Sequence, residues 1–142
     1  MHEAISRVFS PEDVNKVLNK MQVKGFINAK ERNKLKADLD SIINDPKFIV
    51  IHDGADHIWS EQEIFIGDGK VTRPDRIIVK NGSAILIDFK TGEELPDHHL
   101  QVTQYANVIS ACGYPVAETY LYYFKGNEWV KVNNFSGQLS LL

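Results

Sequence analysis

The sequence has a single cysteine, Cys112, so it can form neither an internal disulfide nor a zinc or iron–sulfur site built from four cysteines. This composition fits a protein of the reducing cytoplasm, which is the location we expect. The sequence also lacks the roughly 18 to 20 consecutive apolar residues of a membrane helix, and its N-terminus lacks the charged-then-apolar pattern of a signal peptide. We therefore expect a protein that neither spans a membrane nor is secreted.

An excess of positive charge is missing as well. The 16 Lys and Arg residues are outnumbered by 19 Asp and Glu residues, and the net charge of −3 offers no global field to gather nucleic acid. Any polyanion would have to be bound by a local patch. The Gly67-Asp68-Gly69-Lys70 run lacks the spacing of a phosphate-binding loop and the Ser or Thr that follows its lysine. We therefore expect no nucleotide-driven motor in this chain.

The first third of the sequence has the pattern of two helices. Ser10-Pro11-Glu12-Asp13 is typical of a helix start, and Gly25 is expected to end that helix. Asn28 and Glu31 predict a capping box for a second helix that runs to about Ile43, where an Asn-Asp-Pro sequence follows. With 43% hydrophobic residues, the sequence predicts one compact domain over residues 1–142.

From Lys47 onward, β-branched and aromatic runs alternate with turn residues. They predict strands over roughly 58–66, 71–80, 83–90, 119–125 and 129–132. Between the third and fourth strands, apolar side chains recur at helical spacing from Leu100 to Ile109, and Gly113 is a predicted C-terminal cap. The sequence therefore predicts an α/β fold with a central mixed sheet of about five strands flanked by helices.

The Asn81-Gly82 pair is a strong signal for a two-residue hairpin turn. Counting back along both strands from this turn places Asp75 directly opposite Asp88, and Lys90 on the same face. Two carboxylates so placed have Cβ atoms about 4.5 to 5.5 Å apart and repel each other unless positive charge lies between them. A divalent cation would supply that charge.

An alternative is that these groups form ordinary salt bridges at the strand ends, with Asp75 pairing with Arg73 or Arg76 and Lys90 with Asp88. The apolar Ile85-Leu86-Ile87 run that leads into Asp88 favours a functional site, because charges that follow a buried strand are seldom a solvated face.

Three short motifs occur in order over about thirty residues: 73–76 (RPDR), 87–92 (IDFKTG) and 101–105 (QVTQY). Together they resemble the PD-(D/E)xK nuclease superfamily. The resemblance is greatest to the RecB-type nuclease domain at the C-terminus of AddA-like, UvrD-family bacterial helicase–nucleases. It extends to the His2-Glu3-Ala4-Ile5 start of a first helix and to a strand glutamate at Glu63. It implies a restriction-endonuclease-like core.

The resemblance also implies roles for seven residues and a Mg²⁺ cofactor, with Mn²⁺ as a substitute. The implied metal ligands are His2, Asp75 and Asp88, and the implied catalytic residues are Lys90, Glu63, Gln101 and Tyr105.

Two of these implied residues also depend on local geometry. A two-residue turn at Asp68-Gly69 would put Gln62 opposite Asp75, whereas a three-residue loop would put Glu61 opposite it and bring Glu63 to the acidic face. Gln101 and Tyr105 lie one helical turn apart and are expected on one face. The alternative is that Tyr105 belongs to the core and Gln101 to the surface.

The expected function is Mg²⁺-dependent DNA phosphodiester hydrolysis of the exonuclease type, within a helicase–nuclease that processes DNA ends for recombinational repair. Its expected partners are DNA, as a single strand or duplex end, and a helicase domain of the same parent chain. One alternative is a catalytically inactive DNA-binding or docking module with the same fold. Another is a stand-alone endonuclease, for whose specificity segment the chain leaves little room.

Seven basic residues and one acid, Glu31, lie between residues 16 and 36. Lys16, Lys20 and Lys24 recur every four residues along one side of the first predicted helix. This is a candidate strip for phosphate contacts, with an ordinary solvated helix face as the alternative.

Overall fold

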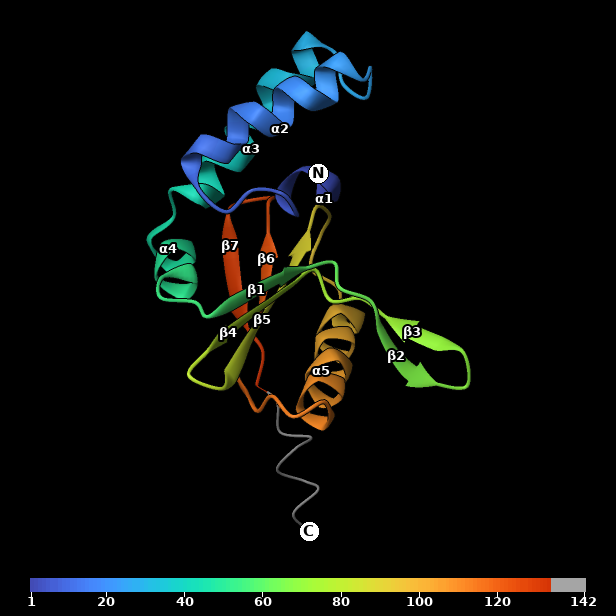
Figure 1. Ribbon diagram of the computed structural model, residues 1–142. Coiled ribbons are helices and arrows are strands. Elements are labelled where there is room, and N and C mark those ends of the chain that lie inside the picture. The colour runs from blue at the N-terminus through green and yellow to red at the C-terminus, as the bar shows by residue number, and fades with distance from the viewer. Residues whose placement is uncertain (134–142) are drawn as a thin grey trace. The chain divides into compact units, whose positions relative to one another are not determined.

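A computed structural model describes residues 1–133 (Figure 1). The backbone contacts divide the chain into two compact units, Met1–Asp53 and a second unit that begins at Gly54, where the sequence predicts a single compact domain. No helix within residues 1–133 is long and apolar enough to cross a membrane.

The first unit is helical. It contains α1 (His2–Ile5), α2 (Pro11–Val23), α3 (Ala29–Ile43) and α4 (Pro46–His52). The predicted capping box of α3 is confirmed, because the Asn28 Oδ1 accepts a hydrogen bond from the Glu31 N–H at 2.8 Å and the Glu31 Oε1 accepts one from the Asn28 N–H at 3.0 Å. Helices α2 and α3 pack together, and Leu18 and Leu39 are fully buried.

Helix α4 was not expected from the sequence, where the Asn-Asp-Pro run marks a stop and strand-like residues follow. Pro46 instead occupies the first turn of a new helix, a position that needs no backbone donor. The Asp45 carboxylate caps it by accepting hydrogen bonds from the N–H groups of Lys47 at 2.8 Å and Phe48 at 3.3 Å. Burial of Phe48 and Ile51 holds this short helix in place.

The second unit contains a mixed sheet in the order β1-β4-β5-β6-β7. Strands β5 and β6 are parallel and the other neighbours are antiparallel. Helix α5 (Pro96–Ala111) forms the crossover between β5 and β6 and packs against both (Figure 1). The predicted α/β fold, with a mixed five-stranded sheet as in a restriction-endonuclease-like core, is confirmed. The strands are β1 (His57–Ser60), β4 (Arg76–Lys80), β5 (Ser83–Lys90), β6 (Val116–Tyr123) and β7 (Glu128–Lys131).

Two predicted strands are each divided in the structure. The segment predicted as one strand over 58–66 contains β1 and β2 (Ile64–Gly67), and the segment over 71–80 contains β3 (Lys70–Thr72) and β4. Glu61 has a φ of 51°, which no regular strand residue adopts, and Pro74 interrupts the second segment. Strands β2 and β3 form a separate hairpin beside the main sheet (Figure 1).

The predicted register of the β4–β5 hairpin is confirmed. Asn81 and Gly82 have φ values of 52° and 80°, as a type I′ turn requires, and Lys80 pairs with Ser83. Ile77 lies opposite Leu86, and both pack with Val79, Ala84 and the α5 residues Ala106 and Ile109 in one buried cluster. The face of the hairpin that carries Ile77 and Leu86 therefore faces α5.

Candidate functional site

Two carboxyl groups lie side by side at the end of the β4–β5 hairpin. The ladder between β4 and β5 ends at the pair Arg76 and Ile87, so the next step brings Asp75 opposite Asp88 on the face covered by α5. The Asp75 Oδ2 accepts a hydrogen bond from the Phe89 N–H at 2.8 Å. A further hydrogen bond joins the Asp75 and Asp88 carboxyl groups. The predicted juxtaposition of the two acids is therefore present.

The electrostatics of this pair follow from its burial. Burial, the negative charge of Asp88 and the hydrogen bond to Asp88 raise the pKa of Asp75 to about 8, against the opposing effects of the Phe89 N–H and Lys90. Asp75 is therefore protonated at neutral pH when no metal is bound. The proton on Asp75 relieves the repulsion between the two carboxyl groups, as a bound cation would.

Lys90 connects this pair to α5 through a chain of polar contacts. Its Nζ lies 2.7 Å from the Asp88 Oδ2 and donates a hydrogen bond to the Gln101 Oε1 at 2.6 Å. The Gln101 Nε2 in turn donates to the Tyr105 hydroxyl oxygen at 2.9 Å. Gln101 and Tyr105 thus share one face of α5, as their spacing predicts, and that face points toward the acids.

The salt-bridge alternative is realised in part, since Lys90 does pair with Asp88. The pair is not a solvated strand end, however, because the side chains of Lys90 and Asp88 are only 18% and 5% exposed. Among residues 1–133, the buried Asp88 Oδ2 also has no partner in a hydrogen bond of standard geometry, despite the close ammonium group. This oxygen retains capacity for another electropositive ligand.

Glu63 lies between β1 and β2 with an exposed side chain, and it is not among the main charges that shift the pKa of Asp75. Both alternatives for the loop at Asp68-Gly69, which follows Glu63, are partly realised. The β2–β3 hairpin closes with Gly67 paired to Lys70 around a two-residue turn, but a bulge in β2 then shifts the register. As a result, the Glu61 N–H donates to the Asp75 carbonyl oxygen at 3.0 Å, the pairing predicted for the longer loop.

His2 is the first residue of α1 and is exposed within the first unit, whereas Asp75 and Asp88 belong to the second. In the part of the chain that the structure describes, no group of three or more His, Cys, Asp or Glu side chains is arranged to hold a metal ion. The two acids nevertheless fit Mg²⁺, which commonly binds through one or two carboxylates and completes its shell with water and substrate phosphate.

Three residues near this site were not singled out as functional from the sequence. Arg76 is fully buried, its Nε donates to the Ser60 Oγ at 3.3 Å, and its guanidinium carbon lies 5.5 Å from the centre of the Phe89 ring. Burial lowers the pKa of Arg76 to about 10, and the charge of Asp75 opposes this shift. Its position directly before the apolar Ile77-Ile78-Val79 run of β4 was the available signal.

The other two are His98 and Tyr123, whose Nδ1 and hydroxyl oxygen lie 2.7 Å apart. Burial lowers the pKa of His98, and the positive charge of Lys90 acts in the same direction. Burial also raises the pKa of Tyr123, and the charge of Asp88 contributes to that shift. No local sequence pattern links His98 of α5 with Tyr123 of β6, because they come together only when β6 pairs with β5 after the crossover.

Comparisons with known proteins add little to this picture. No family model and no curated protein matches the sequence. Among solved structures, the crystal structure of SSO0001 is similar, with 23% sequence identity and a TM-score of 0.41. The match covers 86% of this chain and 59% of that one, so the chain spans less than two thirds of the length of SSO0001.

Proposed function

We propose that the second unit is a metal-dependent deoxyribonuclease domain of the exonuclease type. The observation that carries the proposal is the convergence of Asp75, Asp88 and Lys90 on one buried face of a hairpin, with Gln101 and Tyr105 facing them from α5. The resemblance of the same residues to three nuclease motifs supports it. We further propose that this domain belongs to a helicase–nuclease that processes DNA ends for recombinational repair.

Asp75 and Asp88 would hold Mg²⁺, or Mn²⁺ in its place. When bound, the ion would neutralise charge on the scissile phosphate and lower the pKa of a coordinated water. Binding requires Asp75 to lose the proton that it shares with Asp88, since a ligating carboxylate must be ionised. His2 stays a proposed third ligand on the basis of the resemblance, and Glu63 stays a proposed catalytic residue on the same basis.

Lys90 would provide positive charge beside the reacting phosphate. Its ammonium group has three donors; one is directed to Gln101 and Nζ also lies against the Asp88 carboxylate, which leaves one donor for a phosphate oxygen or a water. In a site this buried, such a fixed charge stabilises developing negative charge more strongly than it would in water. We propose this electrostatic role for Lys90.

Gln101 and Tyr105 would position Lys90. The amide of Gln101 has its orientation fixed at both ends, because its Oε1 accepts from Lys90 and its Nε2 donates to Tyr105. The Tyr105 hydroxyl oxygen accepts that bond, so its own proton is free to contact the DNA backbone. The chain of contacts thus aligns the ammonium group and offers a second donor nearby.

One observation favours a second candidate, an inactive DNA-binding or docking module with the same fold. With Asp75 protonated, the Asp88 carboxylate is paired with Lys90 at 2.7 Å without any metal. Such a cluster could be purely structural. The two candidates differ in whether added Mg²⁺ permits DNA cleavage.

The test is incubation of the purified chain with end-labelled linear single-stranded and duplex DNA, with Mg²⁺, with Mn²⁺ and with EDTA. We expect metal-dependent cutting that is lost in Asp88→Ala and Lys90→Ala, and retained in the controls Glu128→Gln and Lys131→Ala on β7. Intact circular single strands beside digested linear ones would support the exonuclease type. DNA binding without cutting in either metal would favour the inactive module.

A further inference from the structure

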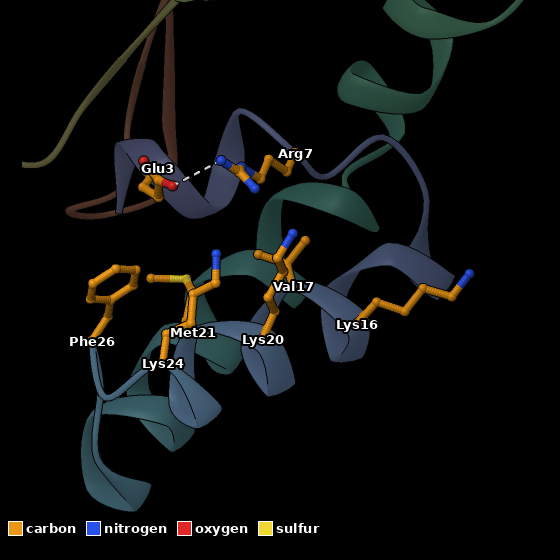
Figure 2. A pocket seen from close by; sticks show the side chains of 8 residues that line it. All are labelled: Glu3, Arg7, Lys16, Val17, Lys20, Met21, Lys24 and Phe26. Atoms are coloured by element: carbon orange, nitrogen blue, oxygen red, sulfur yellow. Dashed lines mark ion pairs between the residues drawn. The ribbon is translucent and has the colours of Figure 1, made fainter.

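The first unit contains a groove of about 190 Å³ between α1 and α2, remote in sequence from Asp75, Asp88 and Lys90. Arg7 lies on the α1 side, and Lys16 and Lys20 of α2 are followed in the row by Lys24, the residue that caps the C-terminal end of that helix (Figure 2). Phe26 lies at the Lys24 end of this row. The groove therefore combines a row of cations with an aromatic ring.

The positive charge of the groove is largely uncompensated. Its one acid, Glu3, is already paired with Arg7 at 3.1 Å. Within residues 1–133, Lys16, Lys20 and Lys24 take part in no ion pair, and all three are exposed. Two of the three lysines of α3 differ, since Lys34 pairs with Asp38 at 3.6 Å and Lys36 with Asp40 at 2.6 Å. The groove thus has charge available for an anionic ligand.

The spacing of the lysines suits a polymer with regularly repeated anions. Residues four apart on an α-helix are separated by about 6 Å along its axis, so the three lysines form a nearly straight row. Successive phosphates of an extended nucleic-acid strand recur at a comparable interval. A single anion would need only one of these side chains, whereas a strand can contact all three.

The apolar part of the groove favours single-stranded over double-stranded nucleic acid as its ligand. Phe26 is 65% exposed, and Val17 and Met21 of α2 also line the groove. An exposed aromatic ring beside cations is typical of surfaces on which unpaired bases stack. Duplex bases are already stacked on one another and would leave this apolar surface without a partner.

We propose that this groove binds single-stranded nucleic acid, with Lys16, Lys20 and Lys24 contacting successive phosphates and Phe26 stacking on a base. The choice of nucleic acid over an acidic peptide rests on the proposed nuclease function. The binding is independent of sequence, because the contacts are to backbone charge and to the face of any base.

The proposal is tested by fluorescence anisotropy of a labelled short oligothymidylate with the full chain, in EDTA so that neither metal binding nor cleavage contributes. The combined variant Lys16→Gln, Lys20→Gln, Lys24→Gln should weaken binding at least tenfold. It should also lower the slope of log K against log salt by about 2, since each lost phosphate contact in a single strand contributes about 0.7.

The matched control is the combined variant Lys30→Gln, Lys34→Gln, Lys36→Gln, which removes the same charge from α3. It should retain most of the affinity. Phe26→Ala should weaken binding about fivefold or more with an unchanged salt slope, because a stacking contact involves no counterions. Circular-dichroism melting of each variant confirms that the fold is retained.

Three outcomes would overturn the proposal: no measurable binding by the unmodified chain, equal loss of affinity in both lysine variants, or tighter binding of a polyglutamate peptide than of the oligothymidylate. The last would identify an acidic protein segment as the ligand. Binding in EDTA is measured separately from metal-dependent cleavage, so failure of the groove proposal leaves the nuclease proposal standing and the two failures are distinguishable.

Discussion

The Lys90 Nζ lies 2.7 Å from the Asp88 Oδ2, two residues back along the same strand. Because side chains alternate across a strand, both project to the α5 face, where the carboxylate is almost fully buried. A buried charge is tolerated only when it is paired. The effects of substitutions at the site should therefore appear in stability as well as in activity.

Replacing Lys90 by Met should lower the rate of DNA cleavage by a factor of about 100 or more, because a fixed charge near the phosphate is lost. It should also destabilise the fold by about 3 kcal/mol, since Asp88 is left buried without its cation. Single-turnover kinetics and urea unfolding measure the two effects. The control is Lys131→Met, where the exposed pair with Glu118 should contribute little. Unchanged stability of the Lys90 variant would contradict the buried ion pair.

The pKa of Asp75 predicts a pH dependence of stability in the absence of metal. The native pKa of about 8 exceeds the ordinary value of 3.8, so the native state holds a proton that the unfolded state releases. The resulting stabilisation is complete below about pH 4 and is lost as the pH rises through 8. Asp75→Asn should therefore flatten this part of the stability profile.

Melting temperatures in EDTA across this pH range provide the measurement. The exposed Asp97, at the start of α5, supplies the control variant Asp97→Asn, which should follow the unmodified chain. If the Asp75→Asn profile is as steep as that of the unmodified chain, the shared proton is absent.

Tyr105→Phe removes the hydroxyl group that accepts the Gln101 hydrogen bond while keeping the ring that packs against the core. We expect kcat to fall about tenfold with little change in KM, because a misaligned amide would position Lys90 less well. Tyr114→Phe is the control, since Tyr114 packs against the same cluster. Equal effects of the two substitutions would show that only packing is involved.

Gly82→Ala tests the turn that places the two acids. Gly82 has a φ of 80°, and an added Cβ would meet no other atom within 4 Å. The substitution should therefore lower the free energy of unfolding by about 1 kcal/mol through backbone conformation alone. Gly92→Ala, where the φ is not positive and the space is equally open, should cost less. Urea unfolding compares the two variants, and a larger loss for Gly92→Ala would contradict this account.

Features set by neighbouring residues were predictable from the sequence. The capping box of Asn28 and Glu31 and the register imposed by Asn81-Gly82 each depend on a few adjacent side chains, and both are confirmed. The placement of Asp75 beside Asp88 followed from that register. Gln101 and Tyr105 share a face because they lie one turn apart.

Other features depend on tertiary contacts that no local pattern contains. Pro46 is compatible with either the end of α3 or the start of α4, and burial of Phe48 decides between them. The break at Glu61 and the bulge in β2 changed the register in a segment whose loop length was ambiguous. The pairing of Tyr123 with His98 arises only when β6 docks beside β5.

The β4–β5 turn also has a consequence for the order in which the protein folds. A two-residue reversal closes a short-range contact, which forms within microseconds, whereas α5 and β6 require a crossover that closes a much larger loop. We therefore expect the two acids to meet on the nascent hairpin before Gln101 and Tyr105 arrive. Protonation of one acid at that early step would lower the barrier, and we expect refolding to be faster in mildly acidic solution than in alkaline solution.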